Sequence, residues 1–297
     1  MNNCSFFPLF SDHSVLSSLH AYAANKKSGY ERESAAIAFQ SLASTLGAPS
    51  APLLLPSLSV LFDLYADKGD VVRTAAKSAA KTILQLFPPE SIRIVFQNLE
   101  SILDNGKWQT KVGVLDALKG FVVPARDAVA AELGNVLPKV EPAMHDTKKE
   151  VGCDLNAWQI ISSWIPWQVT SAAVKCATSL CTTVANPDLA PHIPVLVKCM
   201  SDSDSVPACI KALSSTTFVA EVTSPALAVL VPLLIRALND RSMEVQRRTV
   251  VVIDNLVKLV RDPDVAATYL SPLVDGVSRI AKGAAFPEVS LSIFFDS

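Results

Sequence analysis

The chain has little glycine, few aromatic side chains and almost no net charge. Only 10 of its 297 residues are Gly and 7% are Phe, Trp or Tyr, a composition that disfavours β-sheets, which use many aromatic and β-branched residues. A formal charge of −2 excludes nucleic-acid binding through overall charge, so any basic surface must be local. The longest apolar run, 226–235, is interrupted by Pro232 and falls well short of the ~20 residues that span a membrane. We expect no membrane partner.

Metal-binding and catalytic patterns are missing as well. None of the 6 Cys lies in a C-x-x-C pair, and the 4 His are scattered, so neither a zinc site nor a catalytic triad can be argued from spacing. A phosphate-binding G-x-x-x-x-G-K-[ST] loop is absent, since Gly106-Lys107 is followed by Trp108. We expect no catalytic, cofactor-binding or metal-binding residues and no enzyme activity in this chain. Unpaired thiols suit a reducing compartment, so we expect a cytoplasmic location.

What the sequence does contain is a recurring helical unit. Each unit has an apolar helix with a proline, a polar turn with Asp or Asn, and a second helix led by Val or Trp. Aligning the units gives spacings of 37, 43, 55, 39 and 44 residues between the positions Val71, Trp108, Val151, Val206, Val245 and Val289. Most lie near the ~40-residue period of HEAT and armadillo arrays, whose hairpins bury their apolar faces by stacking. The pattern predicts an all-α HEAT/armadillo-type α-solenoid of stacked helical hairpins.

The spacing of 55 residues has a local cause in a tryptophan-rich segment. Residues 152–169 hold 3 of the 4 Trp, and their removal shortens the spacing to 37. Because exposed loops seldom carry several Trp, we interpret 152–169 as an insertion or retained intron, with an ordinary loop as the alternative. The expected organisation is a helical segment 1–50, a solenoid 51–289 and an aberrant tail 290–297 that leaves the repeat unfinished. The chain is interpreted as a fragment or a mispredicted gene model.

Four stretches carry a resemblance to a known family. In order and spacing they resemble the N-terminal HEAT-repeat domain of fungal translation elongation factor 3, an ABC-F-type ATPase; the stretches are 107–111, 146–151, 216–223 and 252–263. The resemblance covers about residues 52–289. It departs from the family pattern at His145, where the family usually has Trp, and in the first fifty residues, which match poorly.

The resemblance implies a ribosome-binding module. In that family the HEAT domain contacts the small ribosomal subunit, and two downstream ATP-binding cassettes, absent here, drive release of deacylated tRNA from the exit site. The implied partners are small-subunit rRNA and proteins, with other proteins of the translation machinery, and ATP would bind only in the cassettes of the full-length family. Two alternatives stay open: a ribosome-associated regulatory scaffold similar to the activator of the initiation-factor-2 kinase, and a generic HEAT protein–protein adaptor.

Basic residues near the predicted turns are the candidates for ribosome and rRNA binding. They are Lys107, Lys111, Lys148, Lys149, Arg241, Arg247 and Arg248. Because equivalent turns of a solenoid line up along one edge, these charges would form a stripe that grips rRNA phosphates with salt-sensitive affinity. The alternative is a solvated face balanced by acidic neighbours such as Asp104 and Glu244. Trp108 is expected to anchor a hairpin core or, alternatively, to stack on a base.

Overall fold

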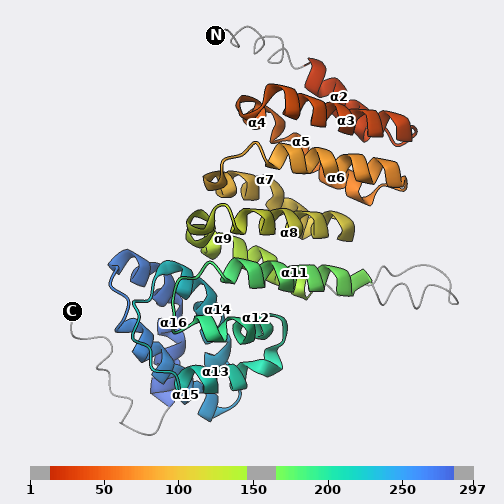
Figure 1. The fold of residues 1–297 in the computed structure, drawn as a ribbon. Coiled ribbons are helices and arrows are strands. Elements are labelled where there is room, and N and C mark those ends of the chain that lie inside the picture. Colours follow the sequence, from red (N-terminus) through yellow and green to blue (C-terminus); the bar gives the residue numbers. More distant parts are fainter. Residues whose placement is uncertain (1–13, 146–164, 284–297) are drawn as a thin grey trace, which may run out of the picture. The chain divides into compact units, whose positions relative to one another are not determined.

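The computed structural model describes residues 14–145 and 165–283 and consists of consecutive helices in these ranges (Figure 1). No β-strand occurs among the described residues. The predicted all-α solenoid of stacked helical hairpins is confirmed. The chain divides into two compact units, the first comprising Met1–Ala125 and Asp146–Ala172, the second Arg126–His145 and Ala173–Ser297. In the described ranges no helix is both long and apolar enough to cross a bilayer.

Unit 1 is a stack of helical hairpins. Its α-helices are α2 (Ser14–Ala24), α3 (Gly29–Leu46), α4 (Ala51–Leu54), α5 (Ser57–Asp63), α6 (Asp70–Leu84), α7 (Ile92–Asn105), α8 (Trp108–Val122) and the first residues of α11 (Ile165–Cys181). Short 3-10 turns occur at Ala48–Ser50, Leu64–Ala66 and Pro89–Ser91. Three hairpins pair α2 with α3, α5 with α6, and α7 with α8. Between hairpins, α3 packs along α6.

The core of unit 1 follows from helical periodicity. On α6, small and branched residues recur on one face and are buried: Val72, Ala76, Ala79, Ala80 and Ile83. The facing helices supply Phe39 from α3 and Phe62 from α5, both with 0% of their surface exposed. Alanines on α6 allow the helices to approach closely, and the aromatic rings fill the space between hairpins.

Unit 2 is organised around α14 (Ser224–Leu238). This helix is apolar on nearly all sides, as expected for a helix enclosed by neighbours. It packs against α9 (Arg126–Met144), α12 (Ile193–Ser201), α13 (Val206–Ser214), α15 (Met243–Val257) and α16 (Pro263–Gly283). The unit also contains the remainder of α11 and 3-10 turns at Ala190–His192 and Ser203–Ser205.

A polar network ties α9, α12 and α14 together inside unit 2. Arg236 of α14 forms an ion pair with Glu141 of α9 and donates to the carbonyl of Cys199 at 3.0 Å. The carbonyl of Met200 is 2.8 Å from Nε2 of His145. These contacts satisfy the carbonyls at the end of α12, which have no partner within their own helix.

The structure places helices in two segments that the sequence pattern set apart from the solenoid. Helices α2 and α3 form a hairpin that packs on α6, so the stack of hairpins includes residues that the sequence pattern set apart as 1–50. Helix α11 begins at Ile165, and Val169 is 2% exposed. The last five residues of the segment 152–169 therefore belong to a helix. Residues 152–164 and the tail 290–297 lie outside the described residues.

Candidate nucleic-acid interface

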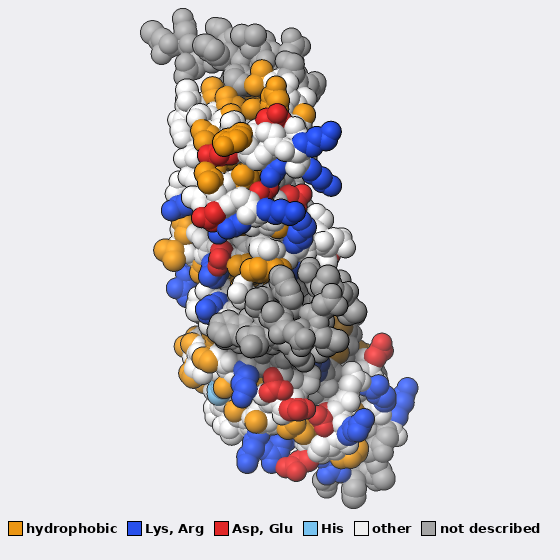
Figure 2. All heavy atoms as spheres, turned by 90° about the vertical axis from the view of Figure 1, so that its right-hand side faces the viewer, with side chains coloured by type: hydrophobic (Ala, Val, Ile, Leu, Met, Phe, Trp, Pro, Cys, Tyr) orange, Lys and Arg blue, Asp and Glu red, His pale blue; other side chains and the backbone are white. Residues whose placement is uncertain are grey.

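In unit 1, each turn that joins the two helices of a described hairpin carries exposed lysine. Lys26 and Lys27 lie between α2 and α3, Lys68 lies between α5 and α6, and Lys107 precedes α8; all four are exposed. These turns lie at the right-hand ends of the hairpins in Figure 1. Figure 2 looks onto this edge and shows Lys and Arg side chains over unit 1 with acidic groups between them. We call Lys26, Lys27, Lys68 and Lys107 the lysine edge.

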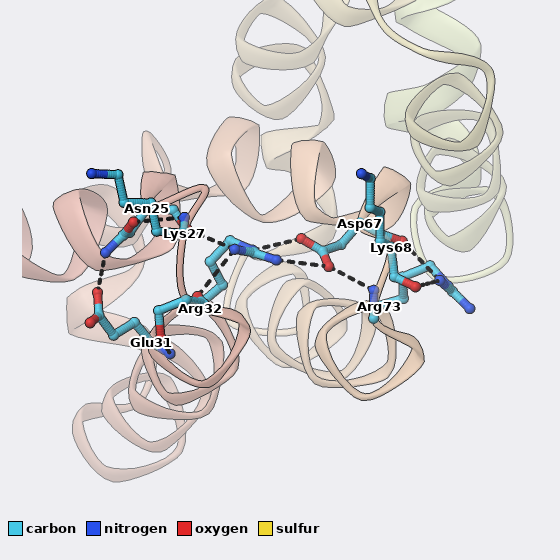
Figure 3. Close-up of polar contacts among 9 residues, drawn as sticks. Asn25, Lys27, Glu31, Arg32, Asp67, Lys68 and Arg73 are labelled. Carbon is cyan, nitrogen blue, oxygen red and sulfur yellow. Dashed lines mark hydrogen bonds and ion pairs between the residues drawn. The ribbon is translucent and has the colours of Figure 1, made fainter.

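Arg32 of α3 joins the first two of these turns (Figure 3). Its Nε and Nη2 donate to the two carboxylate oxygens of Asp67 at 2.6 and 3.1 Å. Its Nη1 donates to the carbonyls of Asn25 at 2.7 Å and Ser28 at 3.1 Å. A planar guanidinium suits this bidentate contact. One side chain thus holds the backbone of the α2–α3 turn against the carboxylate of the α5–α6 turn.

Further hydrogen bonds fix the backbone on which the lysines sit. Asp67 accepts from the amide of Gly69 at 2.8 Å, and Arg73 Nη1 donates to the carbonyls of Asp67 and Lys68 at 2.8 and 3.0 Å. In the first turn, the Asn25 side-chain oxygen accepts from the amide of Lys27 at 2.9 Å. These hydrogen bonds hold the backbone of both turns in place (Figure 3). The side chains of Lys27 and Lys68 are exposed to solvent.

Asp67 and Asp63, two acidic groups at this edge, interact with neighbouring cations. Burial alone would raise the pKa of Asp67, but hydrogen bonds from Arg32 and Gly69 and the charges of Arg32 and Arg73 bring it below its ordinary value. Asp67 is therefore ionised at neutral pH and offsets the charge of Arg32. Burial raises the pKa of Asp63, and the nearby Lys107 partly offsets this rise, which places the third turn beside the end of α5.

The structure separates the residues of the predicted stripe. Lys107 is exposed. Lys111 is 8% exposed, because it lies in the part of α8 that faces the core together with Thr110 and Val114. Lys111 is therefore not an exposed phosphate contact, and the prediction is corrected for this residue. Lys148 and Lys149 lie outside the described residues.

The predicted arginines belong to unit 2. Arg241, in the turn between α14 and α15, and Arg247 of α15 are exposed. Arg248 pairs with Glu244 at 2.6 Å, one helical turn away, in an exposed contact that contributes little to stability. These three arginines form a basic group in unit 2, and Glu244 offsets the charge of Arg248.

Sequence reasoning missed Lys26, Lys27 and Lys68. Lys68 lies in the polar turn that precedes Val71, the position used to align the repeats. The repeat alignment could therefore have identified Lys68 as a turn lysine equivalent to Lys107. Lys26 and Lys27 were missed because they precede the stretch that resembles the family. Among the described residues, no three His, Cys, Asp or Glu side chains cluster closely enough to hold a metal ion.

Comparison with known families agrees with this architecture. The family model "EF3 N-terminal HEAT repeat" matches residues 5–153, and the model "Elongation factor 3/GNC1 HEAT repeat" matches residues 204–292. The chain belongs to the elongation factor 3 HEAT-repeat family. The first match begins at residue 5, so the α2–α3 hairpin, with Lys26 and Lys27, is part of the family region.

Individual relatives carry two different names. The chain is 43% identical over 277 residues to the mRNA export factor elf1 of Schizosaccharomyces pombe, covering 92% of this chain and 24% of that protein. It is 38% identical over 236 residues to elongation factor 3 of Phytophthora infestans, covering 79% and 21%. With elongation factor 3A of Saccharomyces cerevisiae it shares 31% identity over 275 residues, covering 91% and 25%. The chain therefore spans a quarter or less of the length of these relatives.

Proposed function

We propose that this chain is a ribosome-binding HEAT module whose lysine edge contacts phosphates of ribosomal RNA on the small subunit. The observation that carries the proposal is the exposure of Lys26 or Lys27, Lys68 and Lys107 at successive turns. Arg32 and Arg73 hold the backbone of the first two of these turns. Binding would be the whole contribution of this segment, with small-subunit proteins and other translation proteins as neighbours in the cytoplasm. Nucleotide hydrolysis would belong to ATP-binding cassettes elsewhere in a full-length protein.

The spacing of the turns suits a polyanion. Packed helices lie about 8–10 Å apart, so lysines on successive turns present charge at intervals along a line. Such a row contacts several phosphates of one backbone and releases their counterions, and the affinity then falls with salt. Because their backbone is already ordered, little entropy is lost there on binding.

Salt-dependent co-sedimentation with purified 40S and 80S particles tests the proposal. The informative variant is Lys26→Gln/Lys27→Gln/Lys68→Gln/Lys107→Gln, and its matched control is Lys175→Gln/Lys198→Gln/Lys211→Gln/Lys282→Gln, which removes the same charge from exposed sites of unit 2. We expect the wild-type chain to bind at low salt and the edge variant to bind more weakly. For the edge variant, the slope of the logarithm of the binding constant against the logarithm of the salt concentration should be shallower than for wild type. The difference should be about 0.7–0.9 for each phosphate that the variant no longer neutralises.

Two results would contradict the proposal. A wild-type chain that stays at the top of the gradient at low salt would exclude ribosome binding by this segment. An equal decrease of affinity in the edge variant and the unit 2 control would mean that binding depends on overall charge and not on the lysine edge.

Association with messenger ribonucleoprotein is a second candidate. It is favoured by the 43% identity to a protein named as an mRNA export factor. The same lysine edge would contact RNA phosphates in either case. Ultraviolet crosslinking in cells separates the candidates: rRNA recovered through the chain supports the ribosomal function, whereas enrichment of polyadenylated RNA and nuclear fluorescence of a tagged chain support the export function.

A further inference from the structure

A groove on unit 1, between α6 and α8, has a different chemistry from the lysine edge. It has a volume of about 1070 Å³, at the upper end of the ~300–1,000 Å³ typical of ligand pockets. Its wall is mostly aromatic and aliphatic and includes Tyr65, Leu84, Phe87, Trp108, Val112 and Phe121. Trp108 is only half-buried, so it contributes to an open surface as well as to its hairpin. A site of this size and character suits a chain segment better than a single side chain.

The rim of the groove is basic along α6. Arg73, Lys77 and Lys81 line it at intervals of one helical turn, which spreads their charges over about 12 Å. Arg73 is already paired with Asp70 at 2.8 Å, and Lys77 lies 5.9 Å from the centroid of the Tyr65 ring. Within the described part of the chain, neither Lys77 nor Lys81 has a carboxylate partner.

The opposite wall adds little compensating charge. Asp116 of α8 lines the groove, but its carboxylate is 2.8 Å from Nζ of Lys119. The groove therefore combines an apolar floor with two lysines that lack an ion-pair partner among the described residues. This combination is complementary to a ligand with apolar anchors and flanking carboxylates.

Small residues on α8 give the groove its depth. A Cβ on Gly113 would lie 2.5 Å from the Tyr65 ring, so packing requires glycine there. A Cβ on Gly120 would meet no atom within 4 Å, although glycine inside a helix costs about 0.5–1 kcal/mol relative to alanine. Gly120 lines the groove and is exposed. Its packing does not require glycine, whereas a larger side chain there would fill the space.

We propose that this groove binds an acidic amphipathic helix of a partner protein. Leucine or aromatic side chains of that helix would enter the floor, and carboxylates one turn apart would pair with Lys77 and Lys81. The lining of α6 from Arg73 to Leu84 is about 16 Å long, which accommodates about three helical turns. A single-stranded nucleic acid fits less well, because stacking platforms track the backbone with a continuous row of cations, whereas Leu84, Val112 and Ala117 occupy the wall here.

The probe is a fluorescein-labelled 14-residue helical peptide with Leu on one face and Glu pairs one turn apart beside it. Fluorescence anisotropy with the full chain should show binding, and a Glu→Gln version of the peptide should bind more weakly.

Lys77→Glu/Lys81→Glu should weaken binding of the acidic peptide by about tenfold. The same variant should bind a Glu→Lys version of the peptide better than wild type does. Gly120→Trp should block the peptide, with Gly120→Ala as its control.

Other variants and probes make the outcome decisive. Substitution of the lysine edge should leave peptide affinity unchanged, so failure of the ribosomal proposal and failure of this one are distinguishable. Unchanged peptide binding in Lys77→Glu/Lys81→Glu, which alters only exposed side chains, would overturn the proposal even if Gly120→Trp fails to fold. Displacement of the peptide by oligo(U), or a wild-type dimer that Gly120→Trp converts to a monomer, would assign the groove to RNA or to a second copy and would also overturn it.

Discussion

The Arg32–Asp67 pair should be the most pH-sensitive stabilising contact of the lysine edge. Its side chains are 15% and 9% exposed, so it lies between a surface pair worth about 0–1 kcal/mol and a buried pair whose disruption costs about 3–5 kcal/mol. Arg32→Met removes the hydrogen bonds to Asp67, Asn25 and Ser28. We expect a decrease of about 2–3 kcal/mol in the free energy of unfolding of unit 1, with a smaller decrease for Asp67→Asn, which keeps an acceptor for Gly69.

The pH dependence of this effect has a definite sign. The pKa of Asp67 in the folded chain lies below its ordinary value of 3.8. A group of this kind contributes stability that is fully present above its unfolded pKa and is lost as the pH falls through its folded pKa. The difference between wild type and Asp67→Asn should therefore be constant near neutral pH and shrink below about pH 4.

Urea denaturation followed by circular dichroism, from pH 3 to pH 8, measures this difference. Hydrogen exchange of the amides in the turns 25–29 and 67–70 reports the pair directly and does not require the two units to unfold together. Arg248→Met, which removes the exposed pair with Glu244, is the matched control and should cost less than about 1 kcal/mol. Equal stability of Asp67→Asn and wild type at pH 7, or a difference that grows toward acid, would refute the reasoning.

Three substitutions elsewhere have equally specific outcomes. Gly120→Ala should raise the free energy of unfolding by about 0.5–1 kcal/mol in thermal unfolding, because alanine favours the helix and meets no neighbour. Gly113→Ala should lower it by about 1–3 kcal/mol through the clash with Tyr65, and a neutral result would mean that the ring moves freely. Arg236→Met should destabilise unit 2 by about 2–3 kcal/mol, since it leaves Glu141 half-buried without its partner; hydrogen exchange in α12 and α14 tests this.

The repeat pattern predicted the hairpins well because helices such as α6 bury one periodic face. The turns before α6, α8 and α15 fall where the aligned Val71, Trp108 and Val245 place them. The tryptophan-rich segment was harder to divide, because composition alone does not show that a helix begins at Ile165. That division depends on whether residues such as Val169 find a neighbour to pack against.

The candidate site was only partly predictable from sequence. Lys107 and Lys111 sit one helical turn apart near the start of α8, yet the first is exposed and the second is 8% exposed. Sequence spacing places both residues near a turn, but the orientation of α8 against its neighbours decides which side of the helix meets solvent. Arg32 and Asp67 are 35 residues apart, and nothing local in either segment identifies the other as its partner.

Arg73 explains why the two surfaces of unit 1 need separate variants. Its guanidinium holds the carbonyls of Asp67 and Lys68, and the same side chain lines the groove beside Lys77. Substitution of Arg73 would loosen the turn that carries Lys68 and change the groove rim at once, so weaker binding of either ligand would not identify the surface responsible. Lys68→Gln and Lys81→Glu each change one exposed side chain and leave the hydrogen bonds of Arg73 to the backbone intact. If RNA binding responds only to the first and peptide binding only to the second, the two surfaces act independently on one rigid support.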